Sequence, residues 1–358
     1  MVRFPPFEGA RGESLINIEL YKITMKKILS GIQPTGELHL GNYFGAIKNW
    51  VDLQESYECT YSVVDYHSMT MPYKAENLQN NSWRMVYQLL ACGVKAENLF
   101  IQSLIPEHTE LTWILSCVCS YGELTRMTQF KDKSDQTKET SKDSLVSAGL
   151  LFYPVLQAAD ILLYKADYVP IGKDQEQHLE LSRNIAERFN NNFEVDYFRS
   201  PEALFTETPK LLSLANPEKK MSKSLGEKHF VSLFGDANII TKQVKSAVTD
   251  SGEAQSGVMS PGVKNLFELL KACNKTEAYK VNFEKWESGS LQYGALKGDV
   301  AEALIELTQK FKNNLQHIRE NEDSVKEQVF ASSAQIRKKA QQTIDEVREI
   351  TGLAKLRR

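Results

Sequence analysis

Two lysines three residues apart stand in the pentamer Lys220-Met221-Ser222-Lys223-Ser224. A compact cationic segment with two small hydroxyl side chains is suited to binding a polyphosphate rather than to filling a hydrophobic core. A pentamer rich in lysine and serine is, however, more often a solvated surface turn, and that interpretation stays open for the segment taken alone. The polyphosphate interpretation therefore depends on whether a second phosphate-binding segment exists in the chain.

A second candidate segment runs from Gly31 to Asn42, with the sequence GIQPTGELHLGN. A short apolar run precedes it and apolar residues at helical spacing follow it, so the pattern predicts a strand, a glycine turn and a helix N-terminus. This arrangement presents free backbone N–H groups and the positive end of a helix dipole to an anion. His39 can donate to a phosphate oxygen, although an isolated histidine is more often structural. We expect the nucleotide to be held here by Gln33, Pro34, Thr35, His39, Gly41 and Asn42.

A single carboxylate, Asp160, interrupts an otherwise apolar helical pattern over residues 147–164. Burying a carboxylate is costly unless a donor pairs with it, and an isolated one is more often paired with a nearby protein group. An indole N–H, which donates but cannot accept, is an equally well-matched partner. Tyr153 and Gln157 share the helical face of Asp160 at i−7 and i−3. The pattern thus predicts a pocket with an aromatic wall and polar contacts, formed by these residues.

Polar residues also follow two further predicted strands, one of which ends in His67 while the other runs into Gly172. Ligands bind at the carboxyl ends of the strands in open α/β sheets. We expect Gly172 and Lys173 to offer backbone N–H groups to the nucleotide. Asp174 or Gln175 can bond the ribose or a substrate ammonium group, and we place His67 and Gln175 on the amino-acid side of the site.

Strands alternate with helical patterns over residues 25–235, which predicts an α/β fold with a doubly wound parallel sheet, a Rossmann-like nucleotide-binding domain. From about Ile239 nearly every pattern is helical, so we expect residues 236–358 to form a second, α-helical domain. Residues 1–24 are an N-terminal extension whose mixed charge makes it a weak candidate for a targeting segment. The polar residues 135–144 lack apolar periodicity and predict a loop.

The composition is that of an ordinary globular chain, with 358 residues, 42% of them hydrophobic and 25% charged, and a net charge of −3. No apolar run approaches the roughly 20 residues that span a bilayer, so we expect a soluble protein without membrane contact. The slight negative charge argues against a general DNA binder but leaves room for an RNA reader. The cysteines are odd in number and lack zinc spacing, so no metal site is expected, and we expect Cys117 and Cys119, near Trp113, to be reduced and in the core.

The two phosphate-binding segments together resemble the paired signatures of class I aminoacyl-tRNA synthetases. The first is similar to the HIGH signature, with Asn42 where the general pattern has histidine, and this asparagine is common in the tryptophanyl branch. Residues 122–134, 147–164 and 242–250 are likewise similar to segments of that branch. From Met25 to nearly the C-terminus the chain therefore resembles the bacterial-type tryptophanyl-tRNA synthetases.

This resemblance implies activation of L-tryptophan by ATP, carrying Mg²⁺, to tryptophanyl-adenylate and pyrophosphate, and then transfer to the 3′-terminal adenosine of tRNA(Trp). It implies that Asp160 reads the indole nitrogen, that Lys133 reaches towards the ATP phosphates, and that Leu211 packs on the adenine. It also implies a homodimer, an anticodon-binding role for the helical domain, and a cytoplasmic location, or an organellar one if residues 1–24 are a targeting segment. The catalytic candidates are Lys133, Lys220 and Lys223, with Met221, Ser222 and Ser224 completing the ATP-binding loop.

Three alternatives remain open at this level. A tyrosyl-tRNA synthetase shares the fold and both phosphate signatures, but the apolar surroundings of Asp160 disfavour it. A small adenylyltransferase of the same superfold would not need the long helical C-terminal part. A catalytically silent paralogue that only binds tRNA or tryptophan would not need both loop lysines, Lys220 and Lys223.

Overall fold

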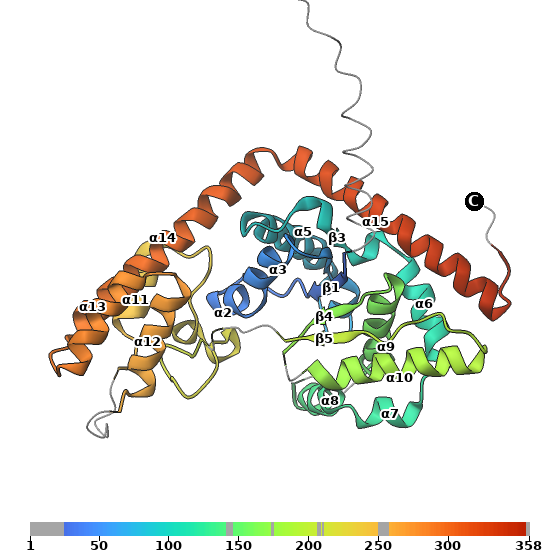
Figure 1. The fold of residues 1–358 in the computed structure, drawn as a ribbon, viewed down its shortest axis with the longest axis horizontal. Coiled ribbons are helices and arrows are strands. Elements are labelled where there is room, and N and C mark those ends of the chain that lie inside the picture. Colours follow the sequence, from blue (N-terminus) through green and yellow to red (C-terminus); the bar gives the residue numbers. More distant parts are fainter. Residues whose placement is uncertain are drawn as a thin grey trace, which may run out of the picture.

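The computed structural model describes residues 25–140, 146–172, 175–205, 209, 211–249 and 258–355. Within these residues five parallel strands form one sheet in the order β3-β2-β1-β4-β5 (Figure 1). The strands are β1 (Lys27–Ile32), β2 (Glu58–Val63), β3 (Leu99–Ile101), β4 (Tyr168–Pro170) and β5 (Glu202–Leu204). The predicted doubly wound parallel sheet is confirmed, and its strand order reverses between β1 and β4, the place where such sheets bind ligands.

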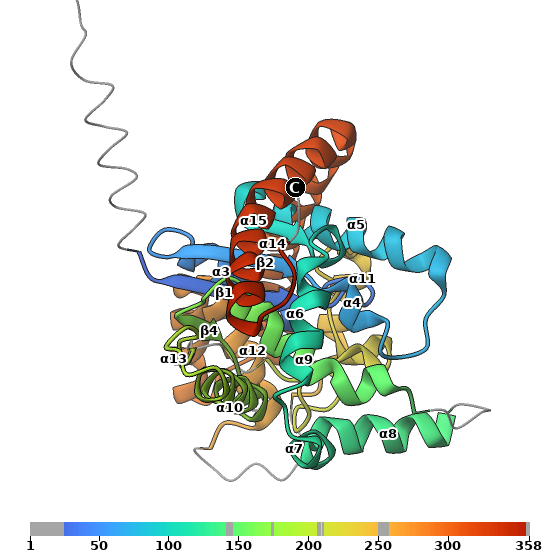
Figure 2. The same cartoon turned by 90° about the vertical axis from the view of Figure 1, so that its right-hand side faces the viewer.

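Helices cover both faces of the sheet (Figures 1 and 2). The helical segments used below are α2 (Leu40–Asn42), the π-helical turn η1 (Tyr43–Ile47), α3 (Lys48–Leu53), α4 (Asp65–Ser68), α5 (Ala75–Ala91), the 3₁₀ turn η3 (Gln102–Leu104), α6 (Glu107–Ser116), α7 (Tyr121–Arg126), α8 (Thr128–Thr140), α9 (Ala148–Leu163), α10 (Glu176–Asn192), the 3₁₀ turns η5 (Lys223–Leu225) and η6 (Glu227–His229), α11 (Ala237–Lys245), α12 (Pro261–Ala272), α13 (Thr276–Glu287), α14 (Tyr293–Glu320) and α15 (Glu322–Thr351).

Alternation along the strands divides the buried side chains between two cores. Ile28 and Tyr61 point towards α3 and α5, in a core that also includes α12 and α14. Leu29 and Phe100 point the other way, in a core shared with α6, α9 and α10. The sheet is therefore buried on both faces, as a parallel sheet requires.

Local chemistry explains where several helices begin. The side chain of Ser147 accepts a hydrogen bond from the Leu150 N–H and so caps α9. Ser260 caps α12, whose first residue is Pro261, a position where a missing N–H costs no hydrogen bond. Asp236 caps α11 through the N–H of Asn238.

Three predictions about local structure were wrong. Residues 135–140 are not a loop but continue α8, because extending an existing helix with residues such as Gln136 and Glu139 is easier than nucleating one; residues 141–144 lie outside the described residues. β2 ends at Val63, and His67 lies in the short helix α4 instead. Cys117 is exposed and Cys119 only partly buried, because the α6 face that carries Trp113 points to solvent, with Trp113 itself 72% exposed.

The C-terminal part is helical, as predicted, but its last helix returns to the sheet. Ile336, Ala340, Ile344 and Val347 of α15 are buried in the same core as α6 and α9. The Ser332 hydroxyl donates to the backbone carbonyl of Leu99 in β3 over 2.6 Å, and Figures 1 and 2 show α15 running past β3 and α6. The domain boundary at residue 236 stays a prediction. Although α15 follows this boundary in the sequence, it packs against the part of the chain that contains the sheet.

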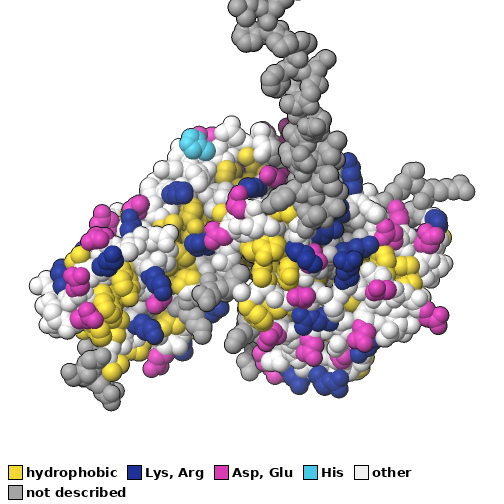
Figure 3. Space-filling model, viewed as in Figure 1, with side chains coloured by type: hydrophobic (Ala, Val, Ile, Leu, Met, Phe, Trp, Pro, Cys, Tyr) yellow, Lys and Arg dark blue, Asp and Glu magenta, His cyan; other side chains and the backbone are white. Residues whose placement is uncertain are grey.

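Charged side chains are spread rather than gathered on the face drawn in Figure 3, where acidic and basic groups alternate. This distribution agrees with the net charge of −3. No helix within the described ranges is long and apolar enough to cross a membrane.

The packing of α15 gives the first prediction. Replacing Ile344, which is fully buried, with alanine should lower the free energy of unfolding by about 2–4 kcal/mol, because a cavity is left in the core. The matched substitution Ile239→Ala, at a position 55% exposed, should change it by less than about 0.5 kcal/mol. Urea unfolding of the whole chain measures both values. Equal effects at the two positions would mean that α15 does not contribute to the core of the sheet.

Candidate functional site

A cavity of about 340 Å³ opens at the carboxyl ends of β1 and β4. Its wall includes the end of β1 with Gln33, the turn η1, the ends of β2 and β4, and the α9 residues Gln157 and Asp160. Gly45 of η1 lines it too, and a Cβ there would meet no protein atom within 4 Å among the described residues. Such π-helical turns are frequent at functional sites. The cavity thus occupies the point at which the strand order reverses, where a ligand was expected.

Three side chains hold the Asp160 carboxylate at the base of this cavity. Gln102 Nε2 donates to Oδ1 over 2.7 Å, and His108 Nδ1 lies 2.6 Å from the same oxygen. His67 Nε2 lies 2.8 Å from Oδ2. Asp160 is 5% exposed, and without these donors its charge would be very costly to bury.

The donors are themselves oriented by the backbone and by buried groups. Gln102 Oε1 accepts from the Tyr66 N–H, so its amide nitrogen must face Asp160. His108 Nε2 lies 2.8 Å from the Tyr164 hydroxyl. Burial raises the pKa of Tyr164 well above its usual value, so the hydroxyl keeps its proton and can donate to Nε2, which leaves Nδ1–H for the carboxylate.

The balance of these effects keeps Asp160 ionised. Burial by itself would raise its pKa, but the hydrogen bonds from His108 and His67 outweigh burial and lower the pKa of Asp160 to about 2. Among the residues that the structure describes, two donors reach Oδ1 and one reaches Oδ2. Since a carboxylate oxygen accepts two, one position on Oδ2 is left for a donor that enters the cavity.

The structure separates the residues expected around Asp160. Gln157 and His67 line the cavity with it, as does Gln175. Tyr153 does not line the cavity; its hydroxyl lies 2.9 Å from His178 Nε2, and its ring packs edge-on against that of His67. Tyr153 therefore supports the wall from behind.

The sequence analysis did not identify Gln102 and His108 as site residues. They follow β3 as the segment Gln102-Ser103-Leu104-Ile105-Pro106-Glu107-His108, and polar residues after a parallel strand were the signal that could have found them. A third polar group, Asn49 of α3, also lines the cavity and was missed.

The turn that resembles the HIGH signature is held from two sides. The His39 N–H donates to Asn42 Oδ1 over 3.1 Å, which fixes the start of α2. The Leu40 N–H donates to the Val231 carbonyl, and the Leu233 N–H donates to that of Leu38. The turn is thus paired with the chain segment that follows the lysine loop.

Glycine is required at two places in this turn. A Cβ at Gly41 would lie 2.8 Å from Cε1 of the His39 ring, so Gly41 makes room for that ring. Gly36 has a φ of +73°, which strains other residues, and a Cβ there would lie 3.3 Å from Lys223 Nζ. Pro34 is buried, while Thr35 is exposed in the turn beside Gln33.

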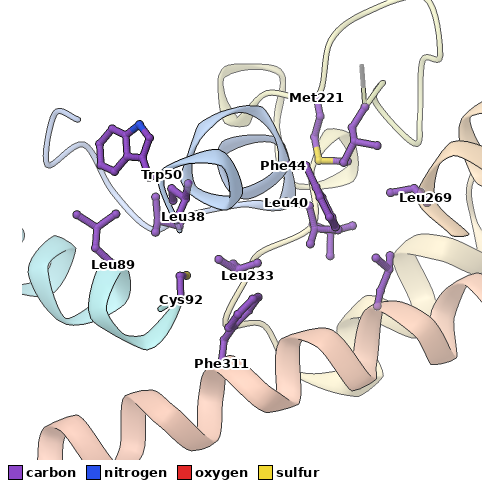
Figure 4. Close-up of a cluster of buried hydrophobic side chains, with 14 of the residues drawn as sticks. Leu38, Leu40, Phe44, Trp50, Leu89, Cys92, Met221, Leu233, Leu269 and Phe311 are labelled. Atoms are coloured by element: carbon purple, nitrogen blue, oxygen red, sulfur yellow. The ribbon is translucent and has the colours of Figure 1, made fainter. Parts of the chain in front are cut away.

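The lysine loop is anchored by its methionine. Met221 is 3% exposed and packs in the core with Leu40 and Phe44 (Figure 4). Its N–H donates to the carbonyl of Leu211, which is also buried. This anchor leaves Lys220 exposed and Lys223 partly buried, with Ser222 between them.

The two phosphate-binding segments lie close enough to affect each other's charge. Burial, and then the charges of Lys223 and Lys220, lower the pKa of His39 to about 4, so the ring is neutral at pH 7. Lys223 Nζ lies 5.8 Å from the centre of the Phe230 ring, which in turn packs on His39. Burial also lowers the pKa of Lys223, while Glu37 opposes that shift.

Four candidate residues cannot be placed as side chains. Lys173 and Asp174 lie outside the described residues, next to Gly172, which does line the cavity. Lys133 lies in α8 and Ser224 in η5, but only their backbones are described.

Comparison with known proteins agrees with this geometry. A family model described as "tRNA synthetases class I (W and Y)" matches residues 24–309. A tryptophan–tRNA ligase of Clostridium acetobutylicum is 43% identical over 298 residues, which cover 82% of this chain and 87% of that protein. Another, of Helicobacter pylori, is 40% identical over 333 residues, covering 92% and 99%. The crystal structure of tryptophanyl-tRNA synthetase from Campylobacter jejuni complexed with ADP and tryptophan has a TM-score of 0.79 at 33% identity, covering 91% of this chain and all of that one.

The contact between the two segments predicts a measurable titration. Lys223→Met should raise the pKa of His39 from about 4, because a nearby positive charge is removed while the ring stays buried. The control Lys219→Met, at an exposed position, should change it much less. NMR of the imidazole nitrogens measures both.

The same titration has a consequence for stability. Because the folded-state pKa of His39 lies below its usual 6.5, its contribution to stability is complete above pH 6.5 and is lost as the pH falls towards 4. Identical His39 titrations in wild type and Lys223→Met would show that the lysine loop does not approach the turn in solution.

Proposed function

The chain belongs to the class I tRNA synthetases for tryptophan and tyrosine, and we propose that it is a tryptophan–tRNA ligase. It activates L-tryptophan with ATP to tryptophanyl-adenylate and pyrophosphate, and then transfers the amino acid to the 3′-terminal adenosine of tRNA(Trp). The observation that carries this proposal is the ionised Asp160, buried at the base of the cavity with one acceptor position left on Oδ2.

That position selects for an indole. The indole N–H of tryptophan completes the set of donors around Asp160. The ring of phenylalanine has no donor, and the hydroxyl of tyrosine lies at a different position from that of the indole N–H. An amino acid that leaves such a buried acceptor unpaired is rejected by a factor of about 10⁴ or more. The tyrosine alternative is therefore disfavoured by the site, in agreement with the tryptophan–tRNA ligases to which the chain is similar.

Adenylate formation needs no general base, because the carboxylate of the amino acid is ionised at neutral pH. One of its oxygens bonds to the α-phosphorus of ATP, and the bond to pyrophosphate breaks. The task of the protein is to position the reactants and to stabilise the charge on the phosphates. Gln33 and Gln175, at the cavity wall, can orient the amino group and the ribose.

Charge stabilisation falls to the two paired segments. His39, neutral at pH 7, can donate to a phosphate oxygen. Lys223 and Lys220 supply positive charge to the departing pyrophosphate. Mg²⁺ enters with ATP as part of the substrate and balances the remaining phosphate charge.

A second copy of the chain, an anticodon-binding part and a cellular location are also proposed. Trp113 and Tyr121, 72% and 71% exposed at the surface of α6 and α7, support a second copy of the chain as a partner, because large aromatic residues are enriched at interfaces. Residues 236–358 are the expected anticodon-binding part, and the expected location is the cytoplasm, or an organellar matrix if residues 1–24 are a targeting segment.

Exchange of labelled pyrophosphate into ATP, run with tryptophan, with tyrosine and without amino acid, tests the proposed function. Only tryptophan should support exchange. Asp160→Asn should lower kcat/KM for tryptophan by about 10²–10⁴, because the asparagine NH2 group cannot accept a hydrogen bond from the surrounding donors and the negative charge is lost. The KM for ATP should change little. Asp52→Asn, at an exposed position, is the matched control.

Two outcomes would contradict this assignment. Equal exchange with tyrosine would favour the tyrosyl alternative, and absence of exchange with every amino acid would favour a silent paralogue. Wild-type kinetics in Asp160→Asn would remove this carboxylate from substrate recognition.

Lys223→Ala should lower kcat for exchange by about 10²–10³, with a smaller effect on the KM for either substrate, because its charge acts mainly when pyrophosphate departs. Lys228→Ala, five residues further along at an exposed position, should have little effect. If both variants exchange pyrophosphate at the wild-type rate, the lysine loop has no catalytic role.

A further inference from the structure

One of the three donors around Asp160 lies next to a buried ion pair that reaches the C-terminal helix. This donor, His108, is the second residue of α6, and the residue before it, Glu107, is only 6% exposed. Arg337 of α15 donates through Nε to both oxygens of the Glu107 carboxylate, each over 2.9 Å. A carboxylate this buried is costly without a partner, so the ion pair connects the first residue of α6 firmly to α15.

The other contacts of this turn are local or have no direction. The residue at the N-cap position of α6 is Pro106, which makes no side-chain hydrogen bond to the turn. The His108 N–H donates to the Ile105 carbonyl, and the Ile105 N–H to the Gln102 carbonyl, so these bonds stay within one segment. The side chain of Ile105 packs in the core, but apolar contacts are not directional. The ion pair therefore adds a directional link from this turn to another helix.

The helix α15 is a firm support at this point. Ile336, the residue before the arginine, is buried in the core shared with α6 and α9. One turn earlier, the Ser332 hydroxyl donates to a backbone carbonyl of β3. Further along α15, Arg348 donates to Glu110 of α6. The helix α15, which runs past α6 in Figures 1 and 2, thus holds α6 one residue before His108 and two residues after it.

The exact position of His108 matters because its contact with Asp160 is short and enclosed. The ring is fully buried, stacks on that of Phe100 with 5.6 Å between the centres, and holds Nδ1 2.6 Å from Asp160 Oδ1. Hydrogen bonds to a charged group are short and strong, so a small displacement of the turn weakens this one substantially. The carboxylate would then be held less firmly in the orientation that leaves a position on Oδ2 for the indole.

We propose that Arg337 is a positioning residue for tryptophan binding: it fixes His108 through Glu107, and His108 in turn fixes the orientation of Asp160. The inference rests on the proposed function and adds to it a residue of the C-terminal helix that does not line the cavity. Because Arg337 makes no contact with the reacting atoms, its effect should fall on the binding of tryptophan rather than on the chemical step.

Pyrophosphate exchange by the full chain tests this inference. Arg337→Met keeps an unbranched side chain of good helix propensity and removes the ion pair. It should raise the KM for tryptophan about tenfold, because a less firmly oriented carboxylate binds the indole more weakly, and should change kcat and the KM for ATP by less than about twofold. A purely structural role would instead reduce the amount of folded enzyme, which lowers the apparent kcat and leaves both KM values unchanged.

A double variant separates positioning from the cost of an unpaired charge. Arg337→Met alone leaves Glu107 buried without its partner, whereas Glu107→Gln combined with Arg337→Met leaves no unpaired charge, so the Tm should recover towards the wild-type value. The KM for tryptophan should nevertheless stay about tenfold higher than in wild type, because α6 is still not connected to α15 at this turn.

NMR of the imidazole groups gives a readout that does not depend on activity. The short hydrogen bond to Asp160 should place the His108 Nδ1 proton far downfield, and this signal should move upfield in both variants. Lys339→Met is the matched control, because it removes an ion pair between the same helix and Glu58, the first residue of β2, at the opposite edge of the sheet from the cavity. It should leave the KM for tryptophan and the His108 signal as in wild type.

The outcomes separate the inference from the proposed function. If tryptophan supports exchange in the wild type but its KM is unchanged in the double variant, the inference is wrong and the proposed function stands. A raised KM with an unmoved His108 signal would also contradict the inference, because the effect would not pass through His108. If tryptophan does not support exchange in the wild type, both are wrong.

Discussion

The constraint on which the site depends is the burial of one negative charge. Asp160 is tolerated between the sheet and α9 only because three donors converge on it, from α4, from η3 and from α6. Each donor follows a strand or begins a helix at the carboxyl edge of the sheet, so its position is set by the register of β2 and β3. The ionisation of Asp160 therefore depends on the strand register that positions its donors.

A second, apolar interaction places the cationic groups. Met221 is buried beside Leu40 and Phe44, and Leu233, together with Leu269 and Phe311 of the C-terminal helices, belongs to the same cluster (Figure 4). The methionine therefore determines where Lys220 and Lys223 can reach, although it carries no charge itself. A flexible, unbranched side chain suits an anchor that must fit an irregular gap between several segments.

Much of this could be read from residue types and spacing, and the limits are physical. The strand before Gly31, the helix that carries Asp160 and the helical C-terminal part have periodic patterns, and the structure contains them. The partners of Asp160 could not be predicted, because Gln102 and His108 reach it only through the pairing of distant strands. The close approach of the His39 ring to Gly41 could not be predicted either, because it depends on the side-chain conformation of the histidine.

The position of α15 has a consequence for how the protein folds during its synthesis. Ile336, Ala340, Ile344 and Val347 complete the core beside β3, yet they are synthesised after all of the strands β1 to β5. Domains usually fold in order as the chain leaves the ribosome. Here the core shared by β3, α6 and α9 stays incomplete until α15 has been synthesised, so nascent chains that stop short of this helix expose apolar surface, and a stop codon shortly before residue 336 would yield a product in which that surface is left uncovered.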